Sequence, residues 1–217
     1  MLKAVLLDFD GTLVTKDILD VICGIVGKEE ASETINKAFH AGKLPGLTAL
    51  ITRINFLKGV CLSQIAKKLD EEAYLMSGAR EIFTYLKQHS ILIIIHSGNI
   101  IPVLLYYQNL LGADYIVGTQ PQMNGDTIAS ISEENFSGQD FKVIGVKEIL
   151  KKLAISAEDT LAIGDSPADK IMFAFAGNSI AVNPKDGIEQ EANHVIKDSL
   201  DAAIQIIENS ILAKKTT

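Results

Sequence analysis

The sequence contains no tryptophan, only two cysteines and relatively few basic residues. Lysine and arginine number 20 against 27 aspartates and glutamates, so the formal net charge is -7 at pH 7. Nucleic acids and anionic membrane surfaces do not attract a negatively charged protein, and we expect no general binding surface for either. The predicted partner is a small molecule.

Long hydrophobic runs are also missing. The longest apolar strings, such as Ile91–Ile95, are far too short to span a bilayer. No signal-peptide layout is expected, because Asp8 and Asp10 interrupt the only early apolar run. Cys23 and Cys61 lie in separate apolar patterns without metal-ligand spacing, which is typical of small core residues in a reducing compartment. We therefore expect a cytoplasmic protein.

Short apolar runs alternate with helical patterns through most of the chain, which indicates an α/β fold with a mostly parallel sheet covered by helices. The predicted strands are Lys3–Leu7, Ile91–His96, Thr160–Ile163, Ser179–Val182 and, more weakly, Val195–Ile196. Tyr115–Val117 and Thr127–Ile131, around the sequence MNGD, predict a small hairpin. In open sheets of this kind the ligand crevice lies at the carboxyl ends of the strands.

One section, residues 15–77, breaks this alternation. It contains no strand-like run, and apolar residues recur in it at helical spacing, first at Ile18, Val21, Ile22 and Ile25. We predict a helical cap domain at 15–77, inserted after the first strand, and an α/β core domain formed by 1–14 and 78–217. Such an insertion could hinge over the crevice and exclude water from it.

Two aspartates end the first predicted strand, in the sequence VLLDFDGTLV. Residues two apart on a strand point to the same side, so Asp8 and Asp10 can face one cavity while Phe9 points into the core. Carboxylates this close repel each other unless a cation or a shared proton intervenes. The pair suits a hard metal such as Mg²⁺ plus a nucleophile and a proton donor. A solvated Asp-Gly turn is the alternative interpretation.

The second and third polar clusters contain a hydroxyl and a lysine. Ser97 and Gly98 end the second predicted strand, where a hydroxyl and free backbone N–H groups could hold a phosphate oxygen. His96 is interpreted as a hydrogen-bonded core histidine. Lys142 begins an amphipathic helix and could reach an anion, and Lys147, well inside that helix, is the alternative lysine.

The fourth cluster lies in LAIGDSPAD. Asp165 is suited to direct metal coordination, and Asp169 could hold the lysine or a metal-bound water. A helix N-cap at Asp165 or Ser166 is the alternative. Taken together, carboxylates, a hydroxyl and a lysine at the carboxyl ends of strands in one sheet fit metal-assisted phosphoryl transfer through an aspartyl-phosphate.

The ordered motifs DFDGT, HSGN, Lys142 and GDSPAD resemble the four motifs of the haloacid dehalogenase (HAD) superfamily of phosphotransferases. The insertion resembles the cap of its phosphoserine phosphatase branch. The resemblance implies a Rossmann-like core with a helical cap and Mg²⁺-dependent phosphomonoester hydrolysis. It further implies that Asp8 attacks phosphorus, and that Asp10 protonates the leaving alkoxide and then deprotonates the hydrolytic water.

The resemblance also implies the ligands of the phosphoryl group and of the metal. Ser97 and Lys142 would hold phosphoryl oxygens, and Gly98 and Asn99 lie in the same substrate-binding motif. The Mg²⁺ ligands would be Asp8, the main-chain carbonyl of Asp10 and Asp165, with Asp169 supporting the metal and the lysine. Spacing within the branch favours Lys142 over Lys147.

Two cap residues bear on the substrate. In the phosphoserine phosphatase branch an acidic residue nine positions after the nucleophile meets the substrate amine, and a cap arginine grips the substrate carboxylate. Asp17 and Arg53 occupy these positions here. The alternatives are a helix N-cap for Asp17 and an intramolecular ion pair for Arg53, because an unpaired guanidinium on so apolar a helix is costly. Phosphoserine is the first substrate predicted.

The sequence departs from the branch at four positions. Asn99 replaces a glycine, Ala168 an asparagine, Gly46 a cap aromatic, and Asp17 a glutamate. These changes leave the catalytic groups intact, and another small phosphate ester, such as a sugar phosphate, is the alternative substrate. Alternatives of another class are a receiver-like phospho-acceptor and a catalytically silent binding protein. The sequence predicts no oligomeric state.

Overall fold

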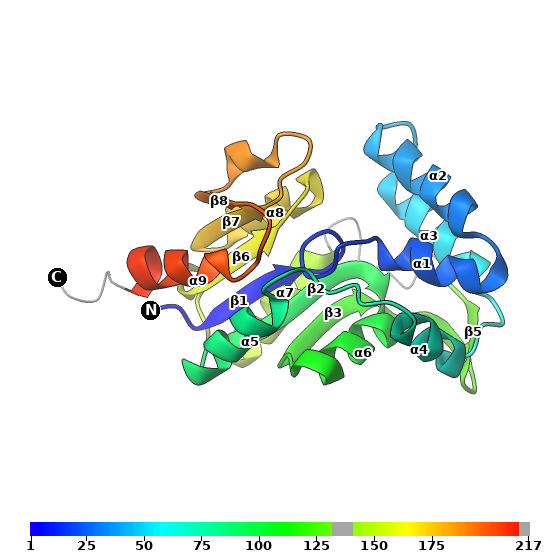
Figure 1. Ribbon diagram of the computed structural model, residues 1–217, viewed down its shortest axis with the longest axis horizontal. Helices are drawn as coiled ribbons and strands as arrows, with labels where there is room; N and C mark the ends of the chain where they lie inside the picture. Colours follow the sequence, from blue (N-terminus) through cyan, green and yellow to red (C-terminus); the bar gives the residue numbers. More distant parts are fainter. Residues whose placement is uncertain (132–140, 213–217) are drawn as a thin grey trace.

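The protein, seen in a computed structural model that describes residues 1–131 and 141–212, is built around a six-stranded sheet. The strand order is β3-β2-β1-β6-β7-β8, and every neighbouring pair is parallel (Figure 1). The strands are β1 (Ala4–Asp8), β2 (Leu92–Ile100), β3 (Tyr115–Thr119), β6 (Thr160–Gly164), β7 (Asn178–Val182) and β8 (His194–Ile196). The predicted fold class is confirmed.

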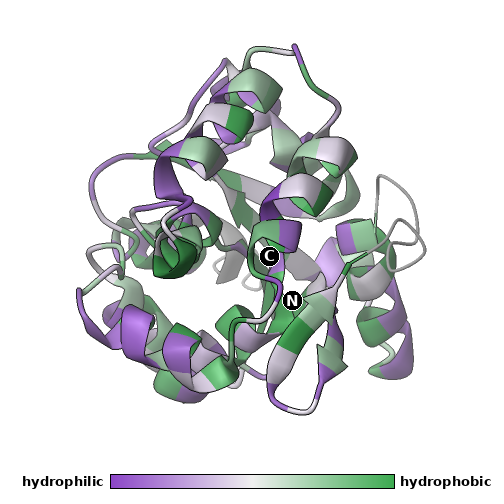
Figure 2. Ribbon diagram, turned by 90° about the vertical axis from the view of Figure 1, so that its right-hand side faces the viewer, coloured by the Kyte–Doolittle hydropathy of each residue, from purple (hydrophilic) through white to green (hydrophobic). Residues whose placement is uncertain are grey.

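Helices cover both faces of this sheet. Alternate residues of β1 point to opposite sides, so Val5 and Leu7 pack with one buried cluster while Ala4 and Leu6 pack with another. The first cluster contains residues of α5 (Ala79–Gln88), α6 (Ile101–Leu111) and α9 (Ala202–Ile206), and the second contains residues of α7 (Phe141–Lys152) and α8 (Lys170–Phe175). Green hydrophobic residues accordingly gather on the strands and inner helix faces in Figure 2.

The prediction of a hairpin that includes Tyr115–Val117 was wrong. These residues lie in β3, which pairs in parallel with β2 at the edge of the main sheet. A parallel pair needs a crossover, and α6 provides it between β2 and β3. The hairpin around MNGD consists instead of β4 (Gln122–Asn124) and β5 (Thr127–Ser130).

The section 15–77 contains helices α1 (Ile18–Cys23), α2 (Glu29–His40), α3 (Gly46–Phe56) and α4 (Leu62–Asp70). Helices α1 to α3 stand beyond the arrowheads of β1 and β2 (Figure 1). Helix α4 packs against α6, where the Tyr106 hydroxyl donates to Asp70 over 2.6 Å. The hairpin joins the same section, because Ile128 and Val60 are linked by a 2.9 Å backbone hydrogen bond. The domain division at 15–77 stays a prediction.

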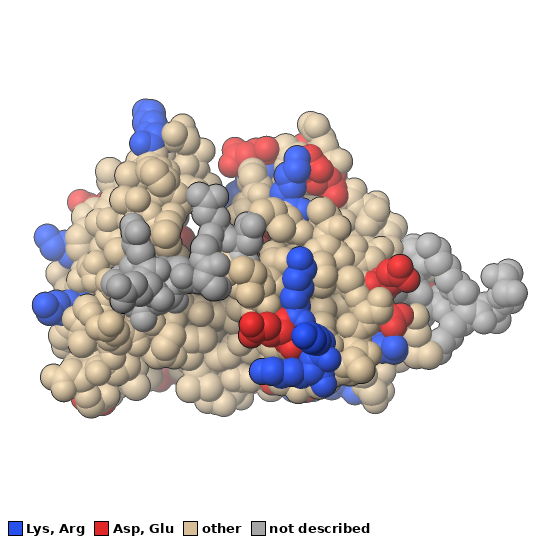
Figure 3. All heavy atoms as spheres, turned by 180° about the vertical axis from the view of Figure 1, so that it is seen from behind, with Lys and Arg blue, Asp and Glu red and all other residues tan. Residues whose placement is uncertain are grey.

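Two features bear on the expectation of a small-molecule partner. None of the described helices is long and apolar enough to cross a bilayer. On the face shown in Figure 3, acidic side chains lie among the basic ones rather than leaving one continuous basic surface. This face therefore gives no support to a nucleic-acid-binding role.

Candidate active site

A cavity of about 560 Å³ opens at the carboxyl ends of the strands, between them and helices α2 and α3. The predicted site residues that line it are Asp8, Asp10, Asp17, Arg53, Ser97, Gly98, Asn99, Lys142 and Asp165. Asp169 lies directly behind this lining and is buried. The structure thus brings the predicted residues together around one cavity, as expected when strand ends meet at one edge of a parallel sheet.

Asp8 and Lys142 form the floor of the cavity. The Lys142 ammonium lies 3.1 Å from Oδ1 of Asp8 and 3.6 Å from Oδ1 of Asp169. Lys147, the alternative lysine, lies elsewhere, with its ammonium 5.0 Å from the centre of the Phe175 ring. Of the two candidate lysines, Lys142 is therefore the one that lies beside Asp8.

The electrostatics of this pair follow from burial and neighbouring charge. Burial and the nearby carboxylate of Asp169 raise the pKa of Asp8 well above its usual range, against the opposing effect of Lys142. Burial alone would lower the pKa of Lys142, but Asp8 and Asp169 together raise it above the ordinary value. Lys142 is therefore a permanent cation at the floor of the site.

Asp10 is held by three different donors. The backbone N–H of Ile18 donates to Oδ1 over 2.8 Å, the Ser97 hydroxyl to Oδ2 over 3.1 Å, and the Asn99 amide lies 3.3 Å from both oxygens. Burial and the charge of Asp17 nevertheless raise the pKa of Asp10 to about 7. A carboxyl group that titrates near neutral pH can both give and take a proton during a reaction.

The motif after the second strand is a continuation of β2 rather than a turn. The pairing of β2 with β3 is irregular between His96 and Ile100, and in this stretch the Asn99 N–H donates to the Ser97 hydroxyl oxygen over 2.9 Å. Gly98 lies close to α3, since a Cβ there would be 3.4 Å from Cδ2 of Leu50. The irregular stretch turns the Ser97 hydroxyl and the Asn99 amide toward Asp10.

His96 was predicted to be a hydrogen-bonded core histidine, and only the burial was right. Neither ring nitrogen makes a well-formed hydrogen bond with any described residue, and Nδ1 lies 3.9 Å from Oδ1 of Asp8. Burial and the neighbouring Lys142 lower the pKa of His96 well below its usual range, so the ring is neutral. The strand pairing of β1 and β2 puts His96 opposite Asp8, and a carboxylate oxygen of Asp169 also lies within 4.8 Å of the ring.

Asp165 and Asp169 occupy the loop after β6. The Asp169 carboxylate accepts the backbone N–H groups of Asp165 (3.1 Å) and Ser166 (3.2 Å), which fixes the loop. Gly164 makes this possible, because a Cβ there would lie 2.4 Å from Cγ of Asp169. The Asp165 carboxylate takes no part in these two bonds and lines the cavity.

Sequence reasoning missed Lys185, whose ammonium lies 2.6 Å from Oδ2 of Asp165. It follows β7 in the sequence VNPKDG and also lines the cavity. A signal was available, because β7 was among the predicted strands and its carboxyl end meets the same edge of the sheet.

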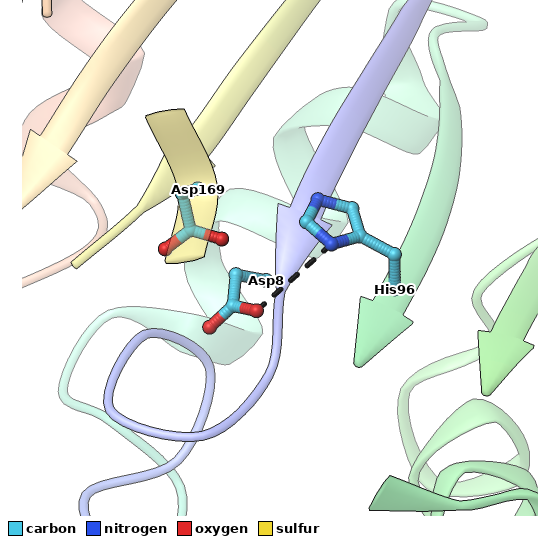
Figure 4. Close-up of side chains that lie close together, drawn as sticks. All are labelled: Asp8, His96 and Asp169. Carbon is cyan, nitrogen blue, oxygen red and sulfur yellow. Dashed lines mark ion pairs between the residues drawn. The ribbon is translucent and has the colours of Figure 1, made fainter. Parts of the chain in front are cut away.

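The acidic groups of the cavity fit a hard divalent cation. Mutual repulsion contributes to the raised pKa values of Asp8 and Asp165, and bound positive charge would relieve it. Among the described residues, Asp8, His96 and Asp169 offer ligand atoms within 4.8 Å of one another (Figure 4). Lys142 already lies between the two carboxylates of that group. Oxygen ligands are preferred by Mg²⁺, which favours Asp8 and Asp165 over His96.

The cap end of the cavity contains a buried ion-pair network. Nη2 of Arg53 contacts the carboxylate of Asp17 and lies 2.8 Å from Oδ1 of Asp20, while Nε donates to the Ser32 hydroxyl over 2.9 Å. Asn36 donates to Asp17 over 2.9 Å. Both alternative interpretations from the sequence hold in this structure, because Arg53 is in an intramolecular ion pair and Asp17 is the N-cap of α1.

Asp20, Ser32 and Asn36 were not predicted from the sequence. Asp20 follows Asp17 by three residues, one helical turn on, and this spacing was the available signal. Ser32 and Asn36 lie on α2, one turn apart, where nothing in the sequence indicates which side of the helix faces Arg53.

The glycine at position 46 is covered by a neighbouring aromatic ring. A Cβ at Gly46 would lie 2.9 Å from Cε2 of Phe39, and both residues line the cavity. An aromatic side chain therefore lines this part of the cavity, from α2 rather than from position 46.

Two aspartates at the end of β1, a hydroxyl on β2, a lysine on α7 and acids after β6 thus meet at one cavity, as the resemblance to the HAD superfamily implies. The family model of haloacid dehalogenase-like hydrolases matches residues 5–174. The chain belongs to this family. It is a phosphatase, because phosphatases among the curated relatives and the solved structures match it over most of its length.

Curated relatives carry the name phosphoserine phosphatase. The one from Methanocaldococcus jannaschii is 30% identical over 204 residues, covering 90% of this chain and 92% of the relative. The one from Campylobacter jejuni subsp. doylei is 25% identical over 193 residues, covering 89% and 93%. The receiver-like and catalytically silent alternatives lose their support.

Solved structures agree with the sequence comparison. A substrate-bound phosphoserine phosphatase complex matches with a TM-score of 0.83 and 27% identity, covering 94% of this chain and 98% of that one. A phospho-aspartyl intermediate analogue of phosphoserine phosphatase matches with a TM-score of 0.81 and 28% identity at the same coverage.

Proposed function

We propose that this chain hydrolyses a small phosphomonoester through an aspartyl-phosphate on Asp8, with phosphoserine as the first substrate to test. The observation that carries the proposal is the meeting of Asp8, Asp10, Ser97 and Lys142 at one end of the cavity. A buried carboxylate beside a permanent cation is suited to attack an anionic phosphoryl group, because the cation offsets the repulsion between the two anions.

The reaction divides between two carboxyl groups. An oxygen of Asp8 forms a bond to phosphorus while the bond from phosphorus to the ester oxygen breaks, and the proton of Asp10 goes to the leaving alkoxide. Asp10 then takes a proton from water as the water oxygen bonds to phosphorus and the bond to Asp8 breaks. Its pKa of about 7 suits both proton transfers.

Ser97 and Lys142 bind the phosphoryl oxygens. The Ser97 hydroxyl and the Lys142 ammonium approach from different elements, β2 and α7, so they can hold two oxygens at once. Charge that develops on these oxygens in the transition state is stabilised by both donors. Asn99, bonded to Asp10, keeps that carboxyl oriented toward the leaving group.

The metal proposed for the site is Mg²⁺. Asp8, Asp165 and the main-chain carbonyl of Asp10 would hold it, with Asp169 supporting the loop and the lysine. When bound, it would neutralise charge on the carboxylates and on the phosphoryl oxygens.

The cap network supports a zwitterionic substrate. Asp17 offers a carboxylate to a substrate ammonium group, and Arg53 offers a guanidinium to a substrate carboxylate. Nε and Nη2 of Arg53 already donate to Ser32, Asp17 and Asp20, whereas Nη1 donates to no described residue and can donate to a ligand. A sugar phosphate would use neither charge and is the second candidate. A cytoplasmic location stays a prediction.

The experiment is phosphate release with Mg²⁺ from L-phosphoserine beside two truncated analogues. O-phosphoethanolamine lacks the carboxylate, a phosphoglycerate lacks the amine, and p-nitrophenyl phosphate reports general phosphatase activity. Phosphoserine should have the highest kcat/KM, and both analogues should lose at least about tenfold. Equal turnover of all esters would remove phosphoserine as the substrate. If wild type released no more phosphate from any of these esters than Asp8→Asn does, the hydrolase proposal would be contradicted.

A further inference from the structure

Lys185 is a cation of the cavity that the reaction described above does not use. Its ammonium lies 2.6 Å from Oδ2 of Asp165, and its backbone N–H donates to the carbonyl oxygen of Asp165 over 2.8 Å. The loop after β7 is thus bonded to the loop after β6 through main chain and side chain together. This arrangement brings an ammonium group to the carboxylate that we propose as a metal ligand.

The two partners differ in how freely they can separate. The side chain of Asp165 is only 3% exposed, whereas that of Lys185 is 57% exposed. The carboxylate is fixed in the wall of the cavity, but the ammonium sits on a flexible stem that already reaches solvent. Lys185 is therefore the partner that can leave while Asp165 stays in position.

The space around the shared oxygen is narrow. Gly11, with a φ of +86°, lies so close that a Cβ there would be 2.2 Å from Oδ2 of Asp165 and 2.9 Å from the Lys185 ammonium. A Mg²⁺ ion binds oxygen at about 2.0–2.1 Å, within the region that the ammonium occupies. A metal ion bound on the side of Oδ2 that faces Lys185 would overlap with the ammonium, so the two cations compete for that side of the oxygen.

We propose that Lys185 is a displaceable internal cation, which neutralises Asp165 in the metal-free protein and must leave Oδ2 before a divalent cation binds there. The proposal rests on the proposed function in one respect, namely that Asp165 is a metal ligand. Lys185 then has two opposite effects. Its contact with Asp165 stabilises the metal-free site. The same contact weakens metal binding, because its free energy is lost when a metal ion displaces Lys185.

The charges of the site explain why such a cation is useful. The charges of Asp169 and Asp165 raise the pKa of Asp8, and the charge of Asp169 raises the pKa of Asp165. Lys142 neutralises the Asp8 and Asp169 side of the cluster. Without a metal ion, Asp165 relies on Lys185 for a counter-charge. Removal of Lys185 leaves a buried carboxylate uncompensated until a metal ion binds.

The test compares Lys185→Gln with a matched control, Lys170→Gln. Lys170 forms an ion pair of the same 2.6 Å length with Glu191, and its side chain is 59% exposed, but Glu191 lies outside the cavity lining. Both changes remove one positive charge, so long-range electrostatics are similar. Mn²⁺ binding is measured from the electron paramagnetic resonance signal of free Mn²⁺, with Mg²⁺ as competitor, and thermal unfolding is recorded with and without Mn²⁺.

We expect Lys185→Gln to bind Mn²⁺ at least about fivefold more tightly than wild type, and Lys170→Gln to stay within about twofold. Without metal, Lys185→Gln should unfold at a lower temperature than Lys170→Gln, and saturating Mn²⁺ should remove that difference. A purely structural ion pair would instead lower the unfolding temperature equally in both conditions.

Two results overturn the proposal in distinguishable ways. If wild type binds Mn²⁺, Asp165→Asn does not, and Lys185→Gln binds no more tightly than Lys170→Gln, only the role of Lys185 is wrong. If neither wild type nor Lys185→Gln binds Mn²⁺, the metal site of the proposed function is wrong and the role of Lys185 falls with it.

Discussion

The buried ion-pair network of Arg53 predicts a large loss of folding stability when its guanidinium group is removed. The guanidinium side chain is 7% exposed and joins Asp20, which is 10% exposed, to Asp17, which is 25% exposed. Arg53→Met keeps most of the apolar stem but leaves two neighbouring carboxylates without their counter-charge. Breaking a buried ion pair in this way costs about 3–5 kcal/mol. That loss is a large share of the about 5–15 kcal/mol that holds a typical domain folded.

Urea unfolding followed by circular dichroism measures this cost. The control is Arg80→Met, because Arg80 is the only other arginine and is exposed on α5, so its removal should change stability by no more than about 0.5 kcal/mol. Adding Asp20→Asn to Arg53→Met should restore part of the loss, since one of the two orphaned charges is then gone. A cost for Arg53→Met below about 1 kcal/mol, as for an exposed pair, would refute the reasoning.

The same network affects how substrate tests are read. An Arg53 variant that loses activity could have lost the fold of its cap rather than a substrate contact. Substrate analogues on the unmodified enzyme avoid this ambiguity, which is why the specificity experiment above relies on them.

Three further predictions concern the strand ends. The raised pKa of Asp10 means that the folded protein binds this proton more tightly than the unfolded chain. The stability that this gives is complete below about pH 3.8 and is lost as pH rises through about 7. In metal-free protein, Asp10→Asn should therefore flatten the dependence of the unfolding temperature on pH over that range, and an unchanged pH dependence would contradict the raised pKa. Gly164→Ala should cost about 1–3 kcal/mol in urea unfolding, because its Cβ collides with Asp169, and a neutral effect would show that the loop yields easily. Lys142→Met should lower kcat at least about 100-fold while Lys147→Met retains activity, and the reverse order would assign the lysine wrongly.

The core sheet and the main site could be predicted because their signals are local. The β1 sequence is a buried apolar run that ends in Asp8, and the same pattern recurs before Asp165. Because the carboxyl ends of parallel strands meet at one edge of the sheet, Asp8 and Asp165 could be placed in one site although they are more than a hundred positions apart. Lys142 could be chosen over Lys147 only through the spacing of a known family, since an isolated lysine carries no directional signal of its own.

The remaining features depend on tertiary contacts that the sequence does not display. The apolar pattern of β3 fits a hairpin strand and a parallel edge strand equally well. Only its pairing with β2 in the folded protein distinguishes the two. Arg53 was rightly expected to need a partner, but its double pairing depends on how α1, α2 and α3 pack. His96 was expected to make a hydrogen bond because buried polar groups usually make one, whereas the register of β1 and β2 leaves its Nδ1 3.9 Å from Oδ1 of Asp8, too far for a hydrogen bond.

The most direct test of the central claim is to trap the phosphoryl group on Asp8. Phosphoserine and Mg²⁺ are mixed with excess enzyme, quenched in acid within milliseconds, and the peptide 4–16 produced by trypsin is analysed by mass spectrometry. The account predicts one added phosphoryl group on Asp8 in wild type and none in Asp8→Asn. In Asp10→Asn the label should both form and decay more slowly, because each step lacks its proton donor or acceptor. Phosphate release by wild type with no label on this peptide, or a label that persists in Asp8→Asn, would contradict it.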